Sequence, residues 1–98
     1  MVRAGEIHVH DGDTFYVGRE AFRLRGVDAP ELEEPGGAAA RSRLRQLLRA
    51  EPVTIVPRLL DAYCRTLADV RAGGRDVADT LRREGLAKPR VWRPGRRP

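Results

Sequence analysis

The sequence is poor in cysteine and lysine, and it contains no long apolar run. Cys64 is the only cysteine, so the chain cannot form an intramolecular disulfide, and cysteine usage does not point to an oxidising compartment. Residues 1–6 lack the apolar core of a secretory signal, and no segment has the composition of a transmembrane helix. We therefore expect no membrane partner, although a signal removed from a longer precursor stays compatible with the sequence.

The length of 98 residues predicts one domain, which we place at residues 1–88, followed by a basic tail rich in proline, glycine and arginine at residues 89–98. The formal net charge is +5, and Lys88 is the only lysine, so arginine supplies most of the positive charge. A guanidinium group matches phosphate oxygens in geometry, which suits an anionic partner such as nucleic acid. Composition fits a second interpretation equally well, in which an arginine-biased sequence solvates an ordinary surface.

Alternating apolar and polar residues predict five short strands, and apolar stripes of helical period predict two helices. The predicted strands are residues 7–10, 14–17, 21–27, 53–56 and 66–70, and the first predicted helix is residues 38–49. A short second helix is expected to begin after Asp76 as N-cap and to end before Gly85 as the C′ residue. Residues 29–37 and 57–65 are predicted loops. This order is typical of an α+β fold, a five-stranded Greek-key barrel of the oligonucleotide-binding (OB) type with two helices.

Three acidic residues lie at predicted strand ends or in the loop that follows. Asp13 precedes the second predicted strand, Asp28 follows the third, and Glu31 lies three residues later. Hard cations are bound by several oxygen atoms, so Asp13 and Asp28 with a backbone carbonyl and waters would supply a Ca²⁺ site. Asp and Gly are also common in turns for local hydrogen-bonding reasons, so the Asp-Gly-Asp sequence at residues 11–13 is weak support by itself.

Two arginines complete the set of groups that phosphodiester hydrolysis requires. Alternation predicts that Arg23 and Arg25 lie on one face of the third strand, and Arg65 immediately precedes the fifth. The reaction needs a group that activates water, a cation on the phosphate, and donors that stabilise the transition state. Glu31, a metal ion on the two aspartates, and the pair Arg23 and Arg65 would fill these roles. Taken singly, each arginine is more often a surface residue.

Four segments resemble the staphylococcal thermonuclease family, in the same order along nearly the whole chain. They are Val9-His10-Asp11-Gly12-Asp13-Thr14, the segment from Phe22 to Glu31, the segment from Asp61 to Ala68, and Gly85-Leu86-Ala87-Lys88. The resemblance implies a calcium-dependent endonuclease that hydrolyses phosphodiester bonds of DNA and RNA. We expect a monomer.

The resemblance also implies a role for each site residue. Asp13 and Asp28 would bind Ca²⁺ through their side chains, and Ala29 would bind it through its backbone carbonyl. Glu31 would position or deprotonate the attacking water, and the two arginines would hold the scissile phosphate. Ala29 stands where the family often has threonine, a change that matters little if only the carbonyl is used.

Further positions either match the family or depart from it. Tyr63 matches a nucleotide-contacting tyrosine, although a tyrosine packed at a strand entrance is an equally good interpretation. Trp92 aligns roughly with a segment that carries substrate-contacting tyrosines, so we expect it to bind substrate. Cys64 replaces the usual glycine, which would strain the turn if that position requires a positive φ. Ala62 replaces a lysine that helps bind a terminal phosphate, so that contact is expected to be lost.

The main alternative is a non-catalytic OB-fold module of the same family that binds nucleic acid without cleaving it. A third interpretation is a calcium-stabilised structural domain whose basic surface is incidental. A site with few protein ligands predicts weak calcium binding, with a Kd on the order of 10⁻⁴ to 10⁻³ M, as in extracellular modules. Cytosolic calcium would rarely fill such a site, so we expect an extracellular or cell-envelope location.

Overall fold

The computed structural model describes residues 2–89 of the chain. The strands are β1 (Ile7–Val9), β2 (Thr14–Val17), β3 (Glu20–Leu24), β4 (Val27–Asp28), β5 (Val53–Leu60), β6 (Thr66–Ala72), β7 (Arg75–Asp76) and β8 (Lys88–Pro89). The helices are α1 (Gly37–Leu47) and α2 (Val77–Arg83), and a short 3₁₀ helix covers Ala4–Glu6. Neither α-helix in this described part has the length and apolar composition needed to cross a bilayer.

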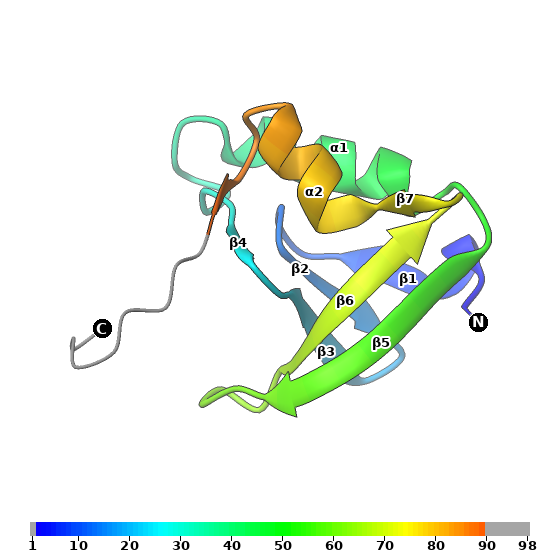
Figure 1. Cartoon of the computed structure of the whole chain (residues 1–98). Coiled ribbons are helices and arrows are strands. Elements are labelled where there is room, and N and C mark those ends of the chain that lie inside the picture. The colour runs from blue at the N-terminus through cyan, green and yellow to red at the C-terminus, as the bar shows by residue number, and fades with distance from the viewer. Residues whose placement is uncertain (1, 90–98) are drawn as a thin grey trace.

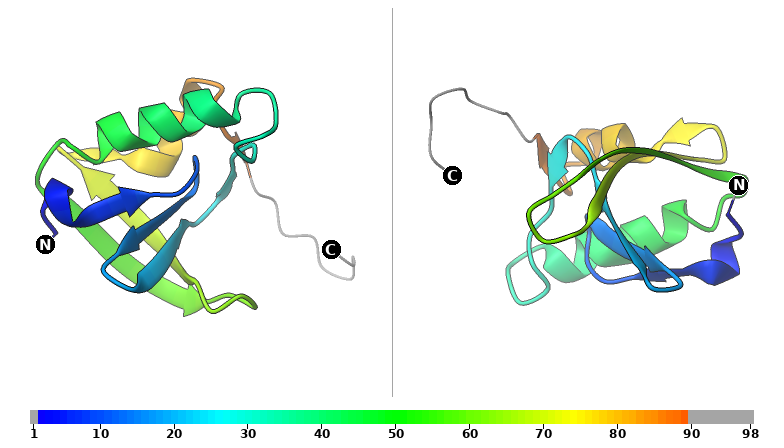
Figure 2. Two further views of the ribbon diagram at one scale, coloured as in Figure 1. Left: turned by 180° about the vertical axis from the view of Figure 1, so that it is seen from behind. Right: turned by 90° about the horizontal axis from the view of Figure 1, so that it is seen from below.

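The main sheet has the strand order β1-β2-β3-β6-β5, with β7 added to β6. All neighbouring strands are antiparallel except β3 and β6, which run parallel with Arg23 opposite Leu67. The sheet curls strongly (Figures 1 and 2), and the N–H of Val2 donates to the carbonyl of Val53 at 3.0 Å. This bridge brings the segment before β1 against β5, at the other edge of the sheet. The predicted OB-type architecture is therefore confirmed.

The hydrophobic core lies between the curled sheet and the two helices (Figure 1). Phe15 of β2 and Phe22 of β3 are cross-strand partners, and their rings stack with centroids 5.5 Å apart. Leu44 of α1 and Leu81 of α2 are completely buried, as is Leu24 at the end of β3. Each such side chain contributes about 1.5–3 kcal/mol by leaving water. Because β3 ends in this core, the residues that follow it are held in a fixed position.

The turn residues confirm several local predictions. The carboxylate of Asp76 accepts a hydrogen bond from the N–H of Asp79 at 2.9 Å, so Asp76 is the N-cap of α2. Gly85 follows α2 with φ of 74°, and Gly18 in the β2–β3 turn has φ of 61°. Both conformations are left-handed and favour glycine.

The third strand ends earlier than alternation predicts. It stops at Leu24, because Gly26 adopts φ of 87° and turns the chain, and Val27 and Asp28 then pair with β8 instead. Arg25 consequently lies outside the strand, and its guanidinium binds the carboxylate of Asp69 at 3.0 Å. The prediction that Arg23 and Arg25 lie on one strand face is therefore wrong.

The fourth predicted strand is longer than expected, because β5 continues to Leu60 through a predicted loop. Pro57 sits inside it, where the pairing register with β6 shifts between Pro57 and Leu59. A bulge of this kind tolerates a residue without an N–H, so the proline bends the strand without ending it. At the other end of the chain, β8 reaches Pro89, the first residue of the predicted tail.

Candidate active site

Asp13 occupies the turn between β1 and β2, and its position depends on its neighbour Gly12. A Cβ atom at Gly12 would lie 2.6 Å from the Cβ of Ala40 in α1 and 2.7 Å from the Cβ of Ala29. Real Cβ atoms do not approach so closely, so only glycine lets this turn press against the helix and the loop after β4. The carboxylate of Asp11 accepts the N–H of Asp13 at 3.2 Å and closes the turn.

The Asp13 side chain points inward, with only 9% of its surface exposed. Its Oδ2 accepts the N–H of Ala29 at 2.9 Å and the guanidinium of Arg23 at 3.2 Å, and its Oδ1 accepts the hydroxyl of Thr14 at 3.0 Å. Burial raises the pKa of Asp13, and the Ala29 N–H and the Arg23 charge offset this only in part. The negative charge is therefore incompletely compensated by the protein.

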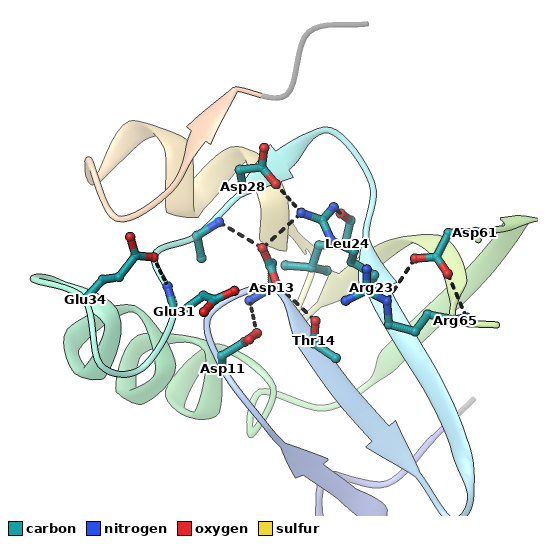
Figure 3. Close-up of polar contacts among 11 residues, drawn as sticks. Asp11, Asp13, Thr14, Arg23, Leu24, Asp28, Glu31, Glu34, Asp61 and Arg65 are labelled. Atoms are coloured by element: carbon teal, nitrogen blue, oxygen red, sulfur yellow. Dashed lines mark hydrogen bonds and ion pairs between the residues drawn. The ribbon is translucent and has the colours of Figure 1, made fainter. Parts of the chain in front are cut away.

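Arg23 joins the two aspartates that the sequence identified. The side chain is 6% exposed, and its Nη2 donates to both Asp13 and Asp28, while Nη1 donates to the carbonyl of Leu24 (Figure 3). A buried arginine is stable only when it is paired, and here one guanidinium contacts carboxylates from two segments. Asp13 and Asp28 therefore converge on one point, although 14 residues of sequence lie between them.

The donor set fits a hard cation that takes few protein ligands. Asp13 and Asp28 provide carboxylate oxygens, and the charge of Asp13 is incompletely balanced. Within the described residues, however, no three His, Cys, Asp or Glu side chains are arranged to hold a metal. The contact seen for Ala29 is made by its N–H rather than its carbonyl. Water would therefore complete the shell that a calcium ion requires.

Glu31 lies in an acidic loop that is folded tightly on itself. Its N–H donates to the Glu34 carboxylate at 2.8 Å, and its carbonyl accepts the Glu34 N–H at 2.9 Å. A Cβ at Gly37 would lie 1.9 Å from the Glu31 carbonyl oxygen, so the start of α1 packs directly on this residue. The hydrogen bond with Glu33 and the charges of Glu33, Glu34 and Asp11 raise the pKa of Glu31. Its exposed carboxyl group thus lies on the Asp11 side of the site (Figure 3).

Arg65 lies immediately before β6, the strand next to the one that carries Arg23. It precedes β6, whose first residue Thr66 is opposite Phe22 of β3. Its guanidinium, however, binds Asp61 at 2.9 Å, and the same carboxylate accepts the backbone N–H groups of Tyr63 and Arg65. Burial raises the pKa of Asp61, but these hydrogen-bond donors lower the pKa by a larger amount. The pKa of Asp61 therefore lies below its ordinary value. Arg65 is therefore aligned by Asp61 and makes no ion pair with the Asp13 cluster.

Tyr63 is 79% exposed, and the guanidinium carbon of Arg65 lies 5.3 Å from its ring centroid. The ring is therefore accessible to a ligand. The competing interpretation, in which the tyrosine packs at a strand entrance, does not fit this exposure. Cys64 has φ of 62°, so its turn does adopt the left-handed conformation that favours glycine. Trp92 lies outside the described residues.

Three positioning residues were missed by sequence reasoning. Gly12 lets its turn contact α1, and Gly37 lets the start of α1 contact the backbone of Glu31. Asp61 holds Arg65. Asp61 did carry a signal, because an acid four residues before an arginine in a predicted loop can fold back onto it. The two glycines carried only a turn signal, since their close contacts come from distant segments.

Comparisons with known proteins agree with the fold and identify a family. A family model described as Staphylococcal nuclease homologue matches residues 21–97. A thermonuclease of Staphylococcus hyicus is 33% identical over 100 residues, covering 90% of this chain and 59% of that protein. A micrococcal nuclease of Shigella flexneri is 36% identical over 74 residues, covering 71% of this chain and 42% of that protein. Staphylococcal-like nuclease CAN1 of Arabidopsis thaliana is 29% identical over 66 residues, or 20% of its length. The chain thus spans less than two thirds of each relative.

Proposed function

Because the chain belongs to the staphylococcal nuclease family, we propose that it is a calcium-dependent nuclease that hydrolyses phosphodiester bonds of DNA and RNA. The observation that carries this proposal is the convergence of Asp13 and Asp28 on the buried guanidinium of Arg23. Carboxylates for a cation and an arginine for a phosphate then lie at one point, as phosphoryl chemistry requires.

In this proposal Asp13, Asp28 and the carbonyl of Ala29 hold Ca²⁺, with water filling the remaining positions. The ion would supply positive charge beside the scissile phosphate. Two protein carboxylates make a weak site, which supports an extracellular or cell-envelope location where calcium is abundant.

The arginines stabilise the charge of the phosphate. Arg23 is already dehydrated and fixed by its two ion pairs, so it needs little reorganisation to donate to a phosphate oxygen. Arg65 is aligned by Asp61 beside the exposed ring of Tyr63, which would stack on a base or sugar. A phosphate that draws Arg23 toward itself frees carboxylate oxygens of Asp13 and Asp28. Cation and phosphate binding should therefore favour each other.

Glu31 activates the attacking water. Its carboxyl group is exposed, and its backbone is fixed by Glu34 and Gly37, so the loop can hold it above the cation site.

The substitution of alanine at position 62 removes a terminal phosphate contact, so affinity for mononucleotides should be low.

The first test is cleavage of single-stranded DNA and RNA by the purified full chain. Cleavage should require Ca²⁺, stop with chelator, return when Ca²⁺ is restored, and be weak with Mg²⁺, which demands a stricter octahedral shell. Undiminished cleavage in chelator would remove the metal from the proposal.

The competing function is a nucleic-acid-binding module that does not cleave. The observation in its favour is that Arg23 is fully engaged by Asp13 and Asp28. Such a module would bind single-stranded DNA but leave it intact at saturating Ca²⁺. The same assay with a binding measurement beside it therefore separates the two functions.

A further inference from the structure

The arginines of α1 divide into two groups with different surroundings. On the flank that faces α2, Arg43 forms an ion pair with Glu84, at 2.7 Å. On the opposite flank, Arg41, Arg45 and Arg49 repeat every four residues, so they form one stripe along the helix and the turn that follows it. None of these three forms an ion pair within the described chain, whereas six arginines outside α1 pair with acids, namely Arg23, Arg25, Arg58, Arg65, Arg82 and Arg83.

The unpaired stripe borders a groove between α1 and β1. The two elements run beside each other (Figure 2), and Arg45, Leu48 and Arg49 line the groove together with Ile7 and His8. The groove has a volume of about 230 Å³, and polar atoms make up the larger part of its lining. The nearby carboxylates of Glu6 and Glu51 are engaged by the backbone, since they accept the N–H groups of Arg3 and Ala4.

The stripe also begins close in sequence to a residue that packs against the candidate active site. Arg41 follows Ala40, the residue on which Gly12 of the Asp13 turn packs. From Arg41 to Arg49 the helical rise is about 12 Å, too long for one phosphate and suitable for several along a chain. Negative charge spread over such a length is characteristic of a nucleic acid strand.

We infer that Arg41, Arg45 and Arg49, with His8 on the facing strand, form a track for the sugar–phosphate backbone of a single strand that continues beyond the scissile bond. The inference rests on the proposed nuclease function and adds a surface that the site itself does not contain. The track predicts that polymers bind more tightly than dinucleotides, because only a polymer reaches both the site and the track. Its contacts are to phosphates, so they are independent of base sequence.

The test compares two double variants that each remove two positive charges. Arg45→Gln with Arg49→Gln removes the track, and Arg19→Gln with Arg75→Gln removes exposed arginines that form no ion pair elsewhere on the described surface. Binding of a labelled oligothymidylate of about 16 nucleotides, the upper site size of OB folds, is measured by anisotropy in chelator, over a range of salt.

The track variant should bind the oligothymidylate about tenfold more weakly, and its log–log salt slope should fall by about 1.4, at roughly 0.7 per lost phosphate contact. The control variant should keep most of the affinity, and Arg45→Lys with Arg49→Lys should as well because charge is retained. A dinucleotide should bind all variants alike. Equal weakening of the track and control variants would show only a net-charge effect and overturn the track.

Failure of the track and failure of the nuclease proposal give different results. If the parent protein does not cleave DNA with Ca²⁺ but the track variant loses affinity, the track stands and the catalytic proposal falls. If the parent cleaves and the track variant binds like the control, the catalytic proposal stands and the track is wrong. Thermal melting of each variant checks that the exposed substitutions leave the fold intact.

Discussion

Cys64 adopts a left-handed backbone conformation in the turn before Arg65, with φ of 62°. Residues other than glycine and asparagine are usually strained in this left-handed conformation. Replacing Cys64 by glycine should therefore raise the free energy of unfolding by about 0.5–1 kcal/mol, after the greater chain entropy of glycine is included. Cys64→Ala removes the thiol but keeps the strain, so its stability should match the parent. Urea denaturation of the three proteins measures this, and equal midpoints would show that the turn is unstrained.

Glu31 is the residue to which we assign water activation. Glu31→Gln keeps the size and removes the base, so kcat should fall by roughly 10² to 10⁴ while the affinity for substrate changes little. Glu20→Gln at the exposed start of β3 is a matched control, because it makes the same substitution outside this loop and leaves the contact between Glu31 and Glu33 intact. Single-turnover cleavage of DNA at saturating Ca²⁺ gives the comparison. Parent-like cleavage by folded Glu31→Gln would exclude Glu31 as the base.

Gly12 should tolerate no side chain. An alanine Cβ would lie within 2.7 Å of both Ala40 and Ala29, so the Asp13 turn would have to move. Overpacking of this kind costs about 1–3 kcal/mol. Gly5→Ala is the control, since no atom lies within 4 Å of a Cβ built there. Thermal melting should show a clear loss for Gly12→Ala only, and adding Ala40→Gly should restore part of it. A loss that Ala40→Gly leaves unchanged would mean that α1 is not the obstacle.

At the scale of elements, Asp69 connects three segments. Its carboxylate, in β6, accepts hydrogen bonds from Arg25 beyond β3 and from Arg58 in β5. The hydrogen bond from Arg25, together with Arg58, lowers the pKa of Asp69 in the folded protein. A depressed folded pKa means that the stabilisation is present above the unfolded value of about 3.9 and is lost as pH falls through the folded value.

Asp69→Asn should therefore lower the melting temperature at neutral pH, and the difference from the parent should shrink as pH falls below about 4. Glu20→Gln at the exposed β2–β3 turn, which has no ion pair in the described chain, serves as control. Melting temperatures of the three proteins, measured from pH 7 to acidic pH, test this prediction. A gap that is constant with pH would show that the ion pairs do not stabilise the fold.

The elements that the sequence predicted correctly are those with strong local signals. Asp76 caps the start of α2 and Gly85 follows its end, as predicted, because capping is a local hydrogen-bonding effect. The errors arise where distant segments decide. Alternation through Val27 concealed the break at Gly26, which depends on pairing with β8, and Pro57 looked like a loop residue because its bulge needs β6 as partner.

The candidate site shows the same limit. Residue types and their order indicated that Asp13, Asp28 and Arg23 act together, but not that Arg23 would bridge both acids. That contact depends on how tightly the sheet curls and on where the loop after β4 lies. Pairing of Arg65 with Asp61 was not predicted, since the sequence motif indicates a phosphate ligand for Arg65 and gives no partner for it in the free protein.

At the scale of the whole molecule, a short chain with one core has little stability in reserve. A domain of this size buries only about 60–65% of the surface of its unfolded chain, so the free energy of binding a ligand would be a large fraction of its total stability. The buried acid Asp13, in the β1–β2 turn, contacts Arg23 of β3 and Ala29 in the loop after β4. A cation that binds there would therefore stabilise contacts among segments distant in sequence.

Calcium should consequently raise the melting temperature in the absence of nucleic acid. At ten to a hundred times a Kd on the order of 10⁻⁴ to 10⁻³ M, binding to the folded state alone adds about 1.4–2.7 kcal/mol. For a domain of this length that corresponds to an increase of about 5–20 °C. Mg²⁺ at the same concentration should have a much smaller effect, because it demands a stricter shell.

Two variants localise the effect to the acidic pair. Asp28→Asn removes one carboxylate that contacts Arg23, so the calcium-dependent increase should largely disappear. Asp79→Asn removes a carboxylate from α2, where it pairs with Arg83, so the increase should be unchanged. Both are compared with and without Ca²⁺, so that any intrinsic loss of stability cancels. Because no cleavage is measured, a calcium shift that survives in Asp28→Asn would place the ion elsewhere on the protein, whatever its catalytic activity.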